Sequence, residues 1–258
     1  MSTVRTLTSS TPPIANDLHF YMYDEVLSQS KYSTTVAEME TRLTDLGLQG
    51  HIGRLGPLKN AKEMVREALQ AGARTIVAVG TDQTFADVIN AVAGLDVTVG
   101  IIPINDATRI GRYLGIENTQ TGCKVLAARK IEAIDLGRVN TQYFLTDIVI
   151  ETNSPVQLEC DNNYQIEAKE TPMTVTIANM TESSDCRDNT LSCFIDTTEQ
   201  GWFRKKKRRT TVPAQRVTVQ SQSDAYAVIE GTTRVKLPIY CEVVPQALKI
   251  IVGKNRIF

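Results

Sequence analysis

The pattern of apolar residues changes near Asp135, and this change restricts the folds that are open to the 258-residue chain. Before Asp135, short apolar runs alternate with amphipathic segments of helical period. Apolar runs without internal polar alternation are typical of parallel strands that helices cover on both faces. After Asp135 the helical periods stop and short β-prone runs follow at close spacing, which is the pattern of an antiparallel sandwich. The sequence therefore predicts a doubly wound α/β domain followed by an all-β sandwich.

The predicted elements divide the chain into three parts. In the first half we expect strands at 18–23, 49–55, 74–80 and 97–103, and helices from about residue 33, over 58–71 and over 84–93. The β-prone runs of the second half are YFLTDIVIE, VQLECD, MTVTIANM, TLSCFID, QRVTVQ, AYAVIE and ALKIIVG. We expect a flexible polar tail at 1–16, an α/β nucleotide-binding-like domain at 17–135 and a β-sandwich domain at 136–258.

The composition narrows the classes of function. A net charge of −1 provides no whole-molecule attraction to nucleic acid or membrane, so such a partner would need a local patch. No apolar run approaches the roughly 20 residues of a membrane span. Five cysteines without C-x-x-C spacing indicate reduced thiols in a cytoplasmic protein and disfavour zinc. Only two histidines are present, which disfavours a histidine-based triad or metal site.

A single turn carries the strongest functional signal. Gly80-Thr81-Asp82-Gln83-Thr84 connects an apolar strand to a helix, and the free N–H groups at a helix start favour phosphate. Phosphate-binding turns are usually rich in glycine, whereas this one has a single glycine. Two interpretations stay open, a plain strand–helix turn capped by Thr81 or Asp82 and a working phosphate loop.

Three segments resemble motifs of the diacylglycerol kinase-like lipid kinases, the group that contains bacterial lipid kinases and sphingosine kinases. The turn at 80–84 followed by DVIN (87–90) is similar to the family's G-G-D-G-T and E-V-x-N. PINDATRIGRYLGI (103–116) resembles P-L-G-T-x-N-D-F-A-R-x-L-G-I, and IDLGRVNTQYFL (134–145) resembles the entry into the family's β-domain. The resemblance covers about residues 18–252. It implies the family's two-domain fold, an ATP and Mg²⁺ site at the turn, and phosphoryl transfer to a lipid hydroxyl.

The motif positions depart from the family's pattern where chemistry would occur. Thr81 and Gln83 replace two glycines of the turn, and Arg109 stands where the resemblance places an aspartate. Asp24 and Glu25 lie where the family has N-P-x-S-G, and two acids there would repel a phosphate. We therefore predict a catalytically degenerate lipid kinase homologue with a binding or regulatory role.

The alternative is an active ATP-dependent lipid kinase that transfers the γ-phosphoryl group to a lipid hydroxyl. The resemblance then implies catalytic roles for Asp82, as the residue that organises Mg²⁺, and for Glu230, as the general base. ATP and Mg²⁺ are expected as cofactors only under this alternative. The nucleotide-binding candidates are Gly80, Thr81, Thr84, Thr108 and Arg112.

One further segment, GWFRKKKRRTT at 201–211, is unusual in a nearly neutral chain. Adjacent cations repel one another and the neighbouring aromatic side chains suit a lipid interface, so we predict docking to an anionic membrane surface or lipid. A solvated hairpin tip is the simpler interpretation. Nucleic acid is disfavoured because the net charge is balanced, while a protein partner or homo-oligomer stays open. The docking candidates are Trp202, Phe203, Arg204, Lys205, Lys206, Lys207, Arg208 and Arg209.

Overall fold

The computed structural model describes residues 18–56, 59–104, 108–169, 172–200 and 205–258. The predicted tail at 1–16 and three docking candidates, Trp202, Phe203 and Arg204, lie outside the described residues. Within the described ranges, no helix is both long enough and apolar enough to cross a membrane.

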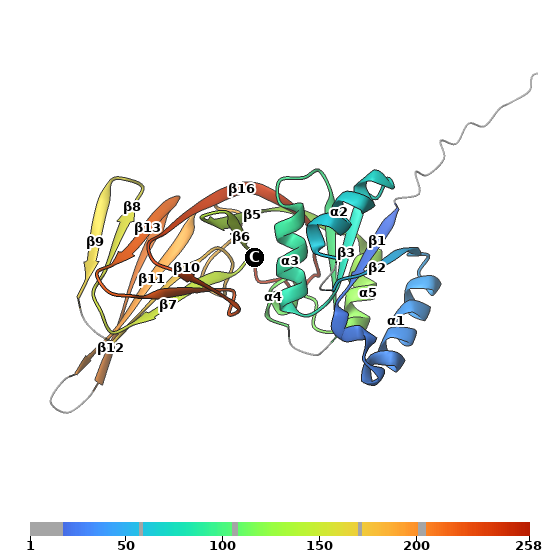
Figure 1. The fold of residues 1–258 in the computed structure, drawn as a ribbon, viewed down its shortest axis with the longest axis horizontal. Coiled ribbons are helices and arrows are strands. Elements are labelled where there is room, and N and C mark those ends of the chain that lie inside the picture. The colour runs from blue at the N-terminus through green and yellow to red at the C-terminus, as the bar shows by residue number, and fades with distance from the viewer. Residues whose placement is uncertain (1–17, 57–58, 105–107, 170–171, 201–204) are drawn as a thin grey trace, which may run out of the picture.

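The first half of the chain forms the predicted parallel sheet (Figure 1). Its strands lie in the order β2-β1-β3-β4, and each pairs in parallel with its neighbour. Their bounds are β1 His19–Tyr23, β2 Gly50–Arg54, β3 Thr75–Gly80 and β4 Thr98–Pro103. Strand β3 is buried along its whole length, which explains why its apolar run shows no polar alternation.

Helices cover both faces of this sheet. The side chains of Ile76 and Ala78 pack in one core with helices α2 and α3, while Val77 and Val79 pack in a second core with α1 and α5. The bounds are α1 Ser33–Asp45, α2 Ala61–Gln70, α3 Asp82–Val92, α4 Arg109–Tyr113 and α5 Thr119–Ala128, with short 3₁₀ turns at Glu25–Ser28 and Ser30–Tyr32. The doubly wound prediction is confirmed.

The sequence analysis assigned no helix to the residues of α5. This segment begins with Thr119-Gln120-Thr121-Gly122, and both threonine and glycine lower helical propensity. The structure explains the glycine, because a Cβ atom at Gly122 would lie 3.2 Å from the Ile102 Cα atom of β4. Close packing of the helix on the sheet therefore takes precedence over local propensity.

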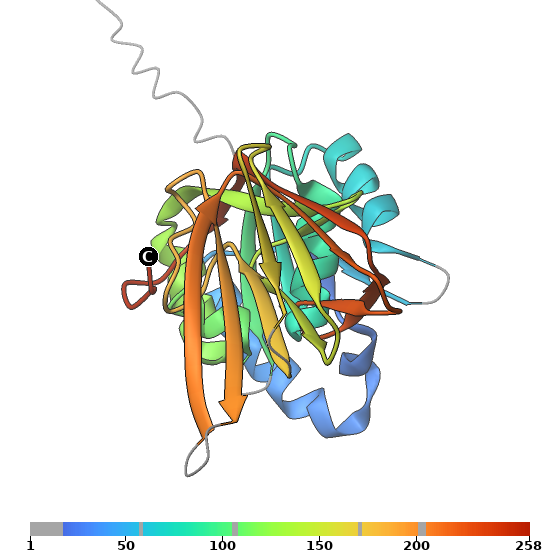
Figure 2. The same cartoon turned by 90° about the vertical axis from the view of Figure 1, so that its left-hand side faces the viewer.

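The second half of the chain forms a β-sandwich, as predicted (Figure 2). One sheet has the order β12-β11-β10-β7-β14-β15, with bounds β7 Asp147–Thr152, β10 Met173–Ala178, β11 Leu191–Gln200, β12 Lys205–Ala214, β14 Tyr226–Ile229 and β15 Thr233–Lys236. The facing strands are β5 Ile131–Val139, β6 Gln142–Phe144, β8 Val156–Cys160, β9 Tyr164–Ala168, β13 Arg216–Ser221 and β16 Ile239–Ile251. Among the described residues no helix follows Ala128.

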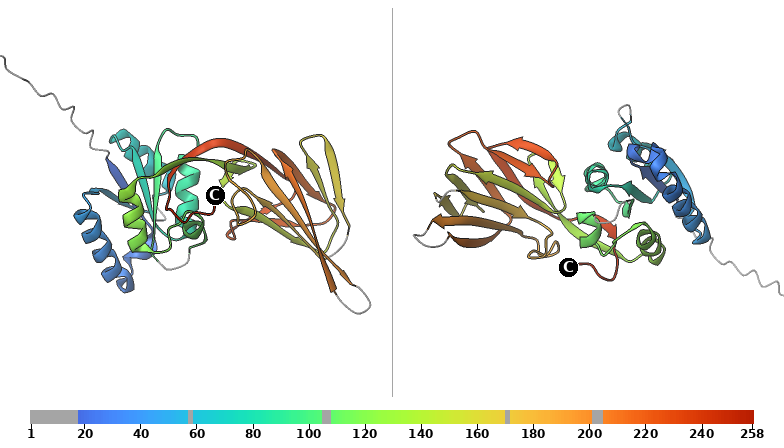
Figure 3. Two further views of the ribbon diagram at one scale, coloured as in Figure 1. Left: turned by 180° about the vertical axis from the view of Figure 1, so that it is seen from behind. Right: turned by 90° about the horizontal axis from the view of Figure 1, so that it is seen from below.

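Strand β16 belongs to both halves of the molecule. Its first part pairs antiparallel with β13, and its end pairs in parallel with β4 at Lys249 and Ile250. The residues beyond it return to the α/β half, where the Gly253 N–H donates to the Leu114 carbonyl. Figure 3 shows β5 and β16 running together between the two halves. One ten-stranded sheet therefore continues from the parallel strands into the sandwich.

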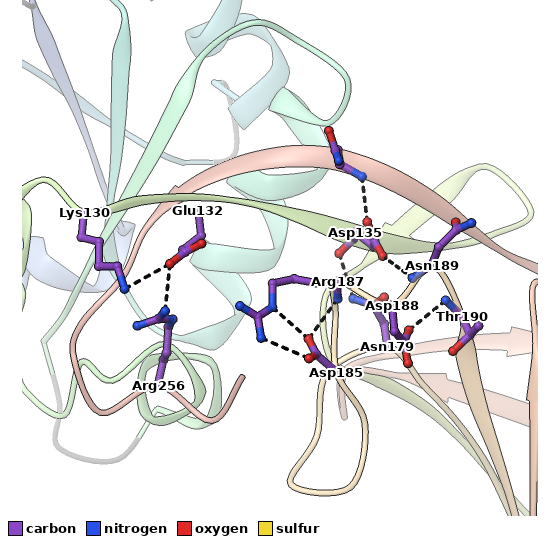
Figure 4. Close-up of polar contacts among 11 residues, drawn as sticks. Lys130, Glu132, Asp135, Asn179, Asp185, Arg187, Asp188, Asn189, Thr190 and Arg256 are labelled. Atoms are coloured by element: carbon purple, nitrogen blue, oxygen red, sulfur yellow. Dashed lines mark hydrogen bonds and ion pairs between the residues drawn. The ribbon is translucent and has the colours of Figure 1, made fainter.

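A buried carboxylate holds this junction together. Asp135 on β5 accepts a hydrogen bond from the Gln246 N–H at 2.8 Å and another from the Asn189 N–H at 2.9 Å. Asn179 donates to the Asp135 carbonyl at 3.0 Å. Figure 4 shows Asp135 between these segments. Gln246 has a positive φ of 47° and lies where the β5–β16 register shifts, so Asp135 supports an irregular part of β16.

Candidate functional site

The turn at 80–84 is occupied by a carboxylate of the chain itself. Asp24, at the end of β1, accepts hydrogen bonds on Oδ2 from the hydroxyls of Thr81, at 3.2 Å, and of Thr84. Its Oδ1 accepts from the Val26 N–H at 2.9 Å. Gly80 is required at this point, because a Cβ atom there would lie 2.6 Å from both the Asp24 Cβ atom and the Thr84 Oγ1 atom.

The backbone of the turn is one that residues other than glycine adopt readily. Thr81 is the N-cap of α3, with φ −109° and ψ 175°, and Gln83 lies within the first turn of the helix. No residue from 80 to 84 has a positive φ. Thr81 and Gln83 therefore replace the family's glycines without backbone strain.

Asp82 does not point into an open site. Its Oδ2 accepts a hydrogen bond from the Arg109 N–H at 2.7 Å, and its Oδ1 accepts one from the Ile110 N–H at 2.9 Å. The Asp82 side chain therefore caps α4, whereas the capped-turn interpretation expected Thr81 or Asp82 to cap α3, whose N-cap is Thr81. Within the described ranges no group of three or more His, Cys, Asp or Glu side chains is arranged to hold a metal ion.

Arg109 connects the two halves of the molecule. One of its guanidinium nitrogens lies 2.9 and 3.0 Å from the two carboxylate oxygens of Asp147, and the other donates to the Thr146 hydroxyl at 2.7 Å. Asp147 and Thr146 are buried. Asn90 makes a second connection, because its amide exchanges two hydrogen bonds of 2.8 Å with the backbone of Tyr143. Sequence analysis missed these partners, because only the fold brings them together.

Glu230 contacts the same junction from the other side. It follows β14 with a φ of 49°, and its Oε1 accepts hydrogen bonds from the N–H groups of Leu145, at 2.8 Å, and Thr146, at 3.0 Å. Burial raises the pKa of Glu230 above its ordinary value, although the hydrogen bonds from Thr146 and Leu145 act in the opposite direction. The carboxylate is thus already engaged by the backbone beside Arg109.

The raised pKa leads to a prediction for Glu230→Gln. A carboxyl group whose pKa is higher in the folded protein binds its proton more tightly there than in the unfolded chain. Tighter proton binding stabilises the folded wild-type protein at low pH. This stabilisation should be lost as the pH rises from about 4.3, the pKa in the unfolded chain, through the higher pKa of the folded protein. We therefore expect the free energy of unfolding of Glu230→Gln, measured in urea relative to that of the wild type, to increase between pH 4 and pH 7. The same shift in the exposed-site variant Glu38→Gln would contradict this assignment.

A cleft of about 640 Å³ lies beside the turn. Its charged side chains are three acids, Asp24, Glu25 and Asp87, and two lysines, Lys59 and Lys62. Lys59 forms an ion pair with Glu67 at 2.6 Å, so the remaining charge of the wall is predominantly negative. Polar residues of both halves complete the lining: Asn60, Gln83, Thr84, Asn90, Thr141 and Gln142.

The remaining sequence-predicted residues are dispersed. Thr108 is buried at the start of α4, and Arg112 is exposed at the end of that helix. Neither lines the cleft beside the turn. The described docking candidates, from Lys205 to Arg209, lie on β12 in the sandwich. The structure therefore brings Gly80, Thr81 and Thr84 to one place with Asp24, and Glu230 to a separate place with Arg109.

Comparison with known proteins identifies the first half of the chain. Residues 22–139 match the diacylglycerol kinase catalytic domain. A Pseudomonas fluorescens protein described as "probable lipid kinase YegS-like" is 34% identical over 88 residues, and a Bacillus subtilis diacylglycerol kinase is 33% identical over 90 residues. Each match covers 33% of this chain, and 29% and 30% of the respective relatives. The matched segment thus spans less than a third of these relatives.

Solved structures extend the likeness to the whole fold. The crystal structure of a diacylglycerol kinase from Bacillus anthracis strain Sterne has a TM-score of 0.76 at 17% identity, over 93% of this chain and 98% of that one. Another structure from the same organism has a TM-score of 0.79 at 16% identity, over 93% and 97%. Residues 22–139 are therefore similar to the diacylglycerol kinase catalytic domain, and the two halves of the chain together have the fold of these solved structures.

Proposed function

We propose that the chain is a catalytically degenerate member of the diacylglycerol kinase-like lipid kinase family with a binding or regulatory role. The observation that carries the proposal is the position of Asp24. Its carboxylate accepts hydrogen bonds from the hydroxyls of Thr81 and Thr84, at the start of α3. A nucleotide phosphate would have to bind at these hydroxyls and at the N–H groups of the same helix end. The chain therefore supplies its own anion at the place where a phosphate would bind.

Electrostatics oppose a second anion at this place. Two unit charges 4 Å apart repel by about 4 kcal/mol in the effective dielectric of a protein surface. A triphosphate would meet Asp24, and the neighbouring Glu25 and Asp87 in the cleft wall would add to the repulsion. Of the two lysines in the described wall, Lys59 is paired with Glu67, which leaves Lys62 to attract an anion. ATP affinity should consequently be low.

The groups needed for phosphoryl transfer are also engaged elsewhere. Both carboxylate oxygens of Asp82 accept hydrogen bonds from N–H groups of α4. Glu230 accepts hydrogen bonds from the N–H groups of Leu145 and Thr146. Arg109 forms an ion pair with Asp147, which neutralises the junction between the halves. In this proposal the cleft serves as a polar binding site for a small ligand, since its volume falls within the range of about 300–1,000 Å³ of such sites.

An active ATP-dependent lipid kinase is the second candidate, and the burial of Glu230 favours it. A carboxylate with a raised pKa is suited to accept the proton of a lipid hydroxyl while the γ-phosphoryl group moves from ATP to that oxygen. Asp82 would have to leave the N–H groups of α4 to reach Mg²⁺.

Calorimetric titration with ATP and Mg²⁺ distinguishes the two candidates. We expect no measurable heat of binding for the wild-type protein at millimolar ATP, because Asp24 holds the anion position. Asp24→Asn keeps the size of the side chain and removes its charge, so this variant should gain affinity for ATP or inorganic phosphate. Micromolar, magnesium-dependent ATP binding by the wild type, abolished in Asp82→Ala, would establish the kinase instead.

A further inference from the structure

The hairpin of β11 and β12 extends beyond the body of the sandwich (Figures 1 and 2). Its backbone pairing continues without interruption to Gln200 and Lys205. Among the side chains that the structure describes, the last ones of this hairpin that pack in the sandwich core are Ile195 and Val212. We define the basic arm as residues 196–200 and 205–209, the described part of the hairpin past the paired residues Ile195 and Thr210.

The basic arm has a charge that the rest of the chain does not share. Residues 205–209 are all cationic, against two acids, Asp196 and Glu199, which gives the arm a formal charge of +3. The whole chain has a net charge of −1. Arg209 forms two hydrogen bonds, of 2.7 and 2.8 Å, with Asp196 and lies over the Phe194 ring. The register places Lys206 opposite Glu199 and the other lysines opposite neutral residues.

The fold itself does not require this run of cations. Five adjacent cations on one strand repel one another, so the run lowers the stability of the hairpin itself. A paired ribbon holds their backbone at fixed spacing and away from the acidic cleft beside the turn. This arrangement is complementary to an extended anionic surface.

We propose that the basic arm docks the protein on an anionic lipid bilayer. A flat bilayer can be reached by the end of a projecting arm alone, whereas a nucleic acid duplex would also lie along a body with no net positive charge. Clusters of four to eight Lys and Arg residues are sufficient for binding to phosphatidylserine-rich surfaces. This inference does not depend on whether the cleft binds a nucleotide.

Co-sedimentation with vesicles tests the proposal. The 258-residue chain should bind vesicles that contain phosphatidylserine, should not bind pure phosphatidylcholine vesicles, and should be released by high salt. Replacing Lys205, Lys206, Lys207 and Arg208 by serine should weaken binding at least about tenfold. The thermal unfolding midpoint should change little, because the arm lies outside the core.

A matched control removes the same charge from the body. Lys31, Arg66, Lys124 and Lys254 are exposed and lie outside the arm, and their joint replacement by serine should leave vesicle binding unchanged. Three results would overturn the proposal: wild-type binding that is independent of phosphatidylserine, equal loss in both quadruple variants, or arm-dependent binding to single-stranded nucleic acid in a gel-shift assay without vesicle binding.

Discussion

Replacing Asp135 by alanine should reduce the free energy of unfolding by about 3–4 kcal/mol, the largest effect that we expect from a single substitution. The carboxylate is buried and accepts hydrogen bonds from the N–H groups of Gln246 and Asn189. These two residues lie 111 and 54 positions away from Asp135 in the chain. Each N–H group that loses its acceptor where water cannot replace it costs about 1–3 kcal/mol. Urea unfolding followed by circular dichroism measures the loss.

Two variants sharpen this experiment. Asp135→Asn retains one acceptor oxygen, so its loss of stability should be smaller than that of Asp135→Ala. Asp188→Ala removes an exposed carboxylate that accepts the Thr190 N–H at 2.9 Å in the same region (Figure 4). Surface substitutions of this kind usually change stability by about 0.5 kcal/mol. A loss below about 1 kcal/mol for Asp135→Ala would show that water replaces the carboxylate and that the junction does not depend on it.

Arg109→Ala should destabilise the protein by about 2–3 kcal/mol. The substitution leaves the Asp147 carboxylate and the Thr146 hydroxyl, which are both buried, without their guanidinium partner. Breaking a fully buried ion pair costs about 3–5 kcal/mol, and partial exposure of the Arg109 side chain reduces this figure. Because Arg109 lies on α4 and Asp147 on β7, amide hydrogen exchange should become faster on both sides of the junction.

Arg112→Ala is the matched control for this variant. Arg112 lies one turn further along α4 and is exposed, so its loss should change neither stability nor exchange appreciably. Combining Arg109→Ala with Asp147→Asn removes both charges, and the double variant should be more stable than Arg109→Ala alone. If the two arginine variants behave alike, the ion pair does not hold the halves together.

The ion pair also bears on the proposed function. Arg109 stands where the resemblance places an aspartate, and the structure shows it joined to the β-domain. An aspartate at this position would face Asp147 and repel it. The substitution therefore replaces a potential site for Mg²⁺ or phosphate by a structural connection between the two halves, which supports the proposal of a degenerate site.

The fold class follows from local patterns that the sequence carries by itself. Uninterrupted apolar runs such as 76–79 predict buried parallel strands, and alternating runs such as 173–178 predict sandwich strands, because burial on two faces or on one determines the spacing of apolar side chains. The basic run at 204–209 and the presence of a single glycine at 80–84 are likewise visible in the sequence alone.

The arrangement of the site is decided by tertiary structure. Asp24 and Thr81 are 57 residues apart, and Arg109 and Asp147 are 38 apart, so no local period relates them. Asp82 resembles a site residue by its position in the turn, but the fold brings the start of α4 to its carboxylate and makes it a cap. The return of β16 to β4 joins strands about 150 residues apart. Side-chain periodicity reports which face of an element is buried, whereas the identity of the neighbour depends on how distant segments pack.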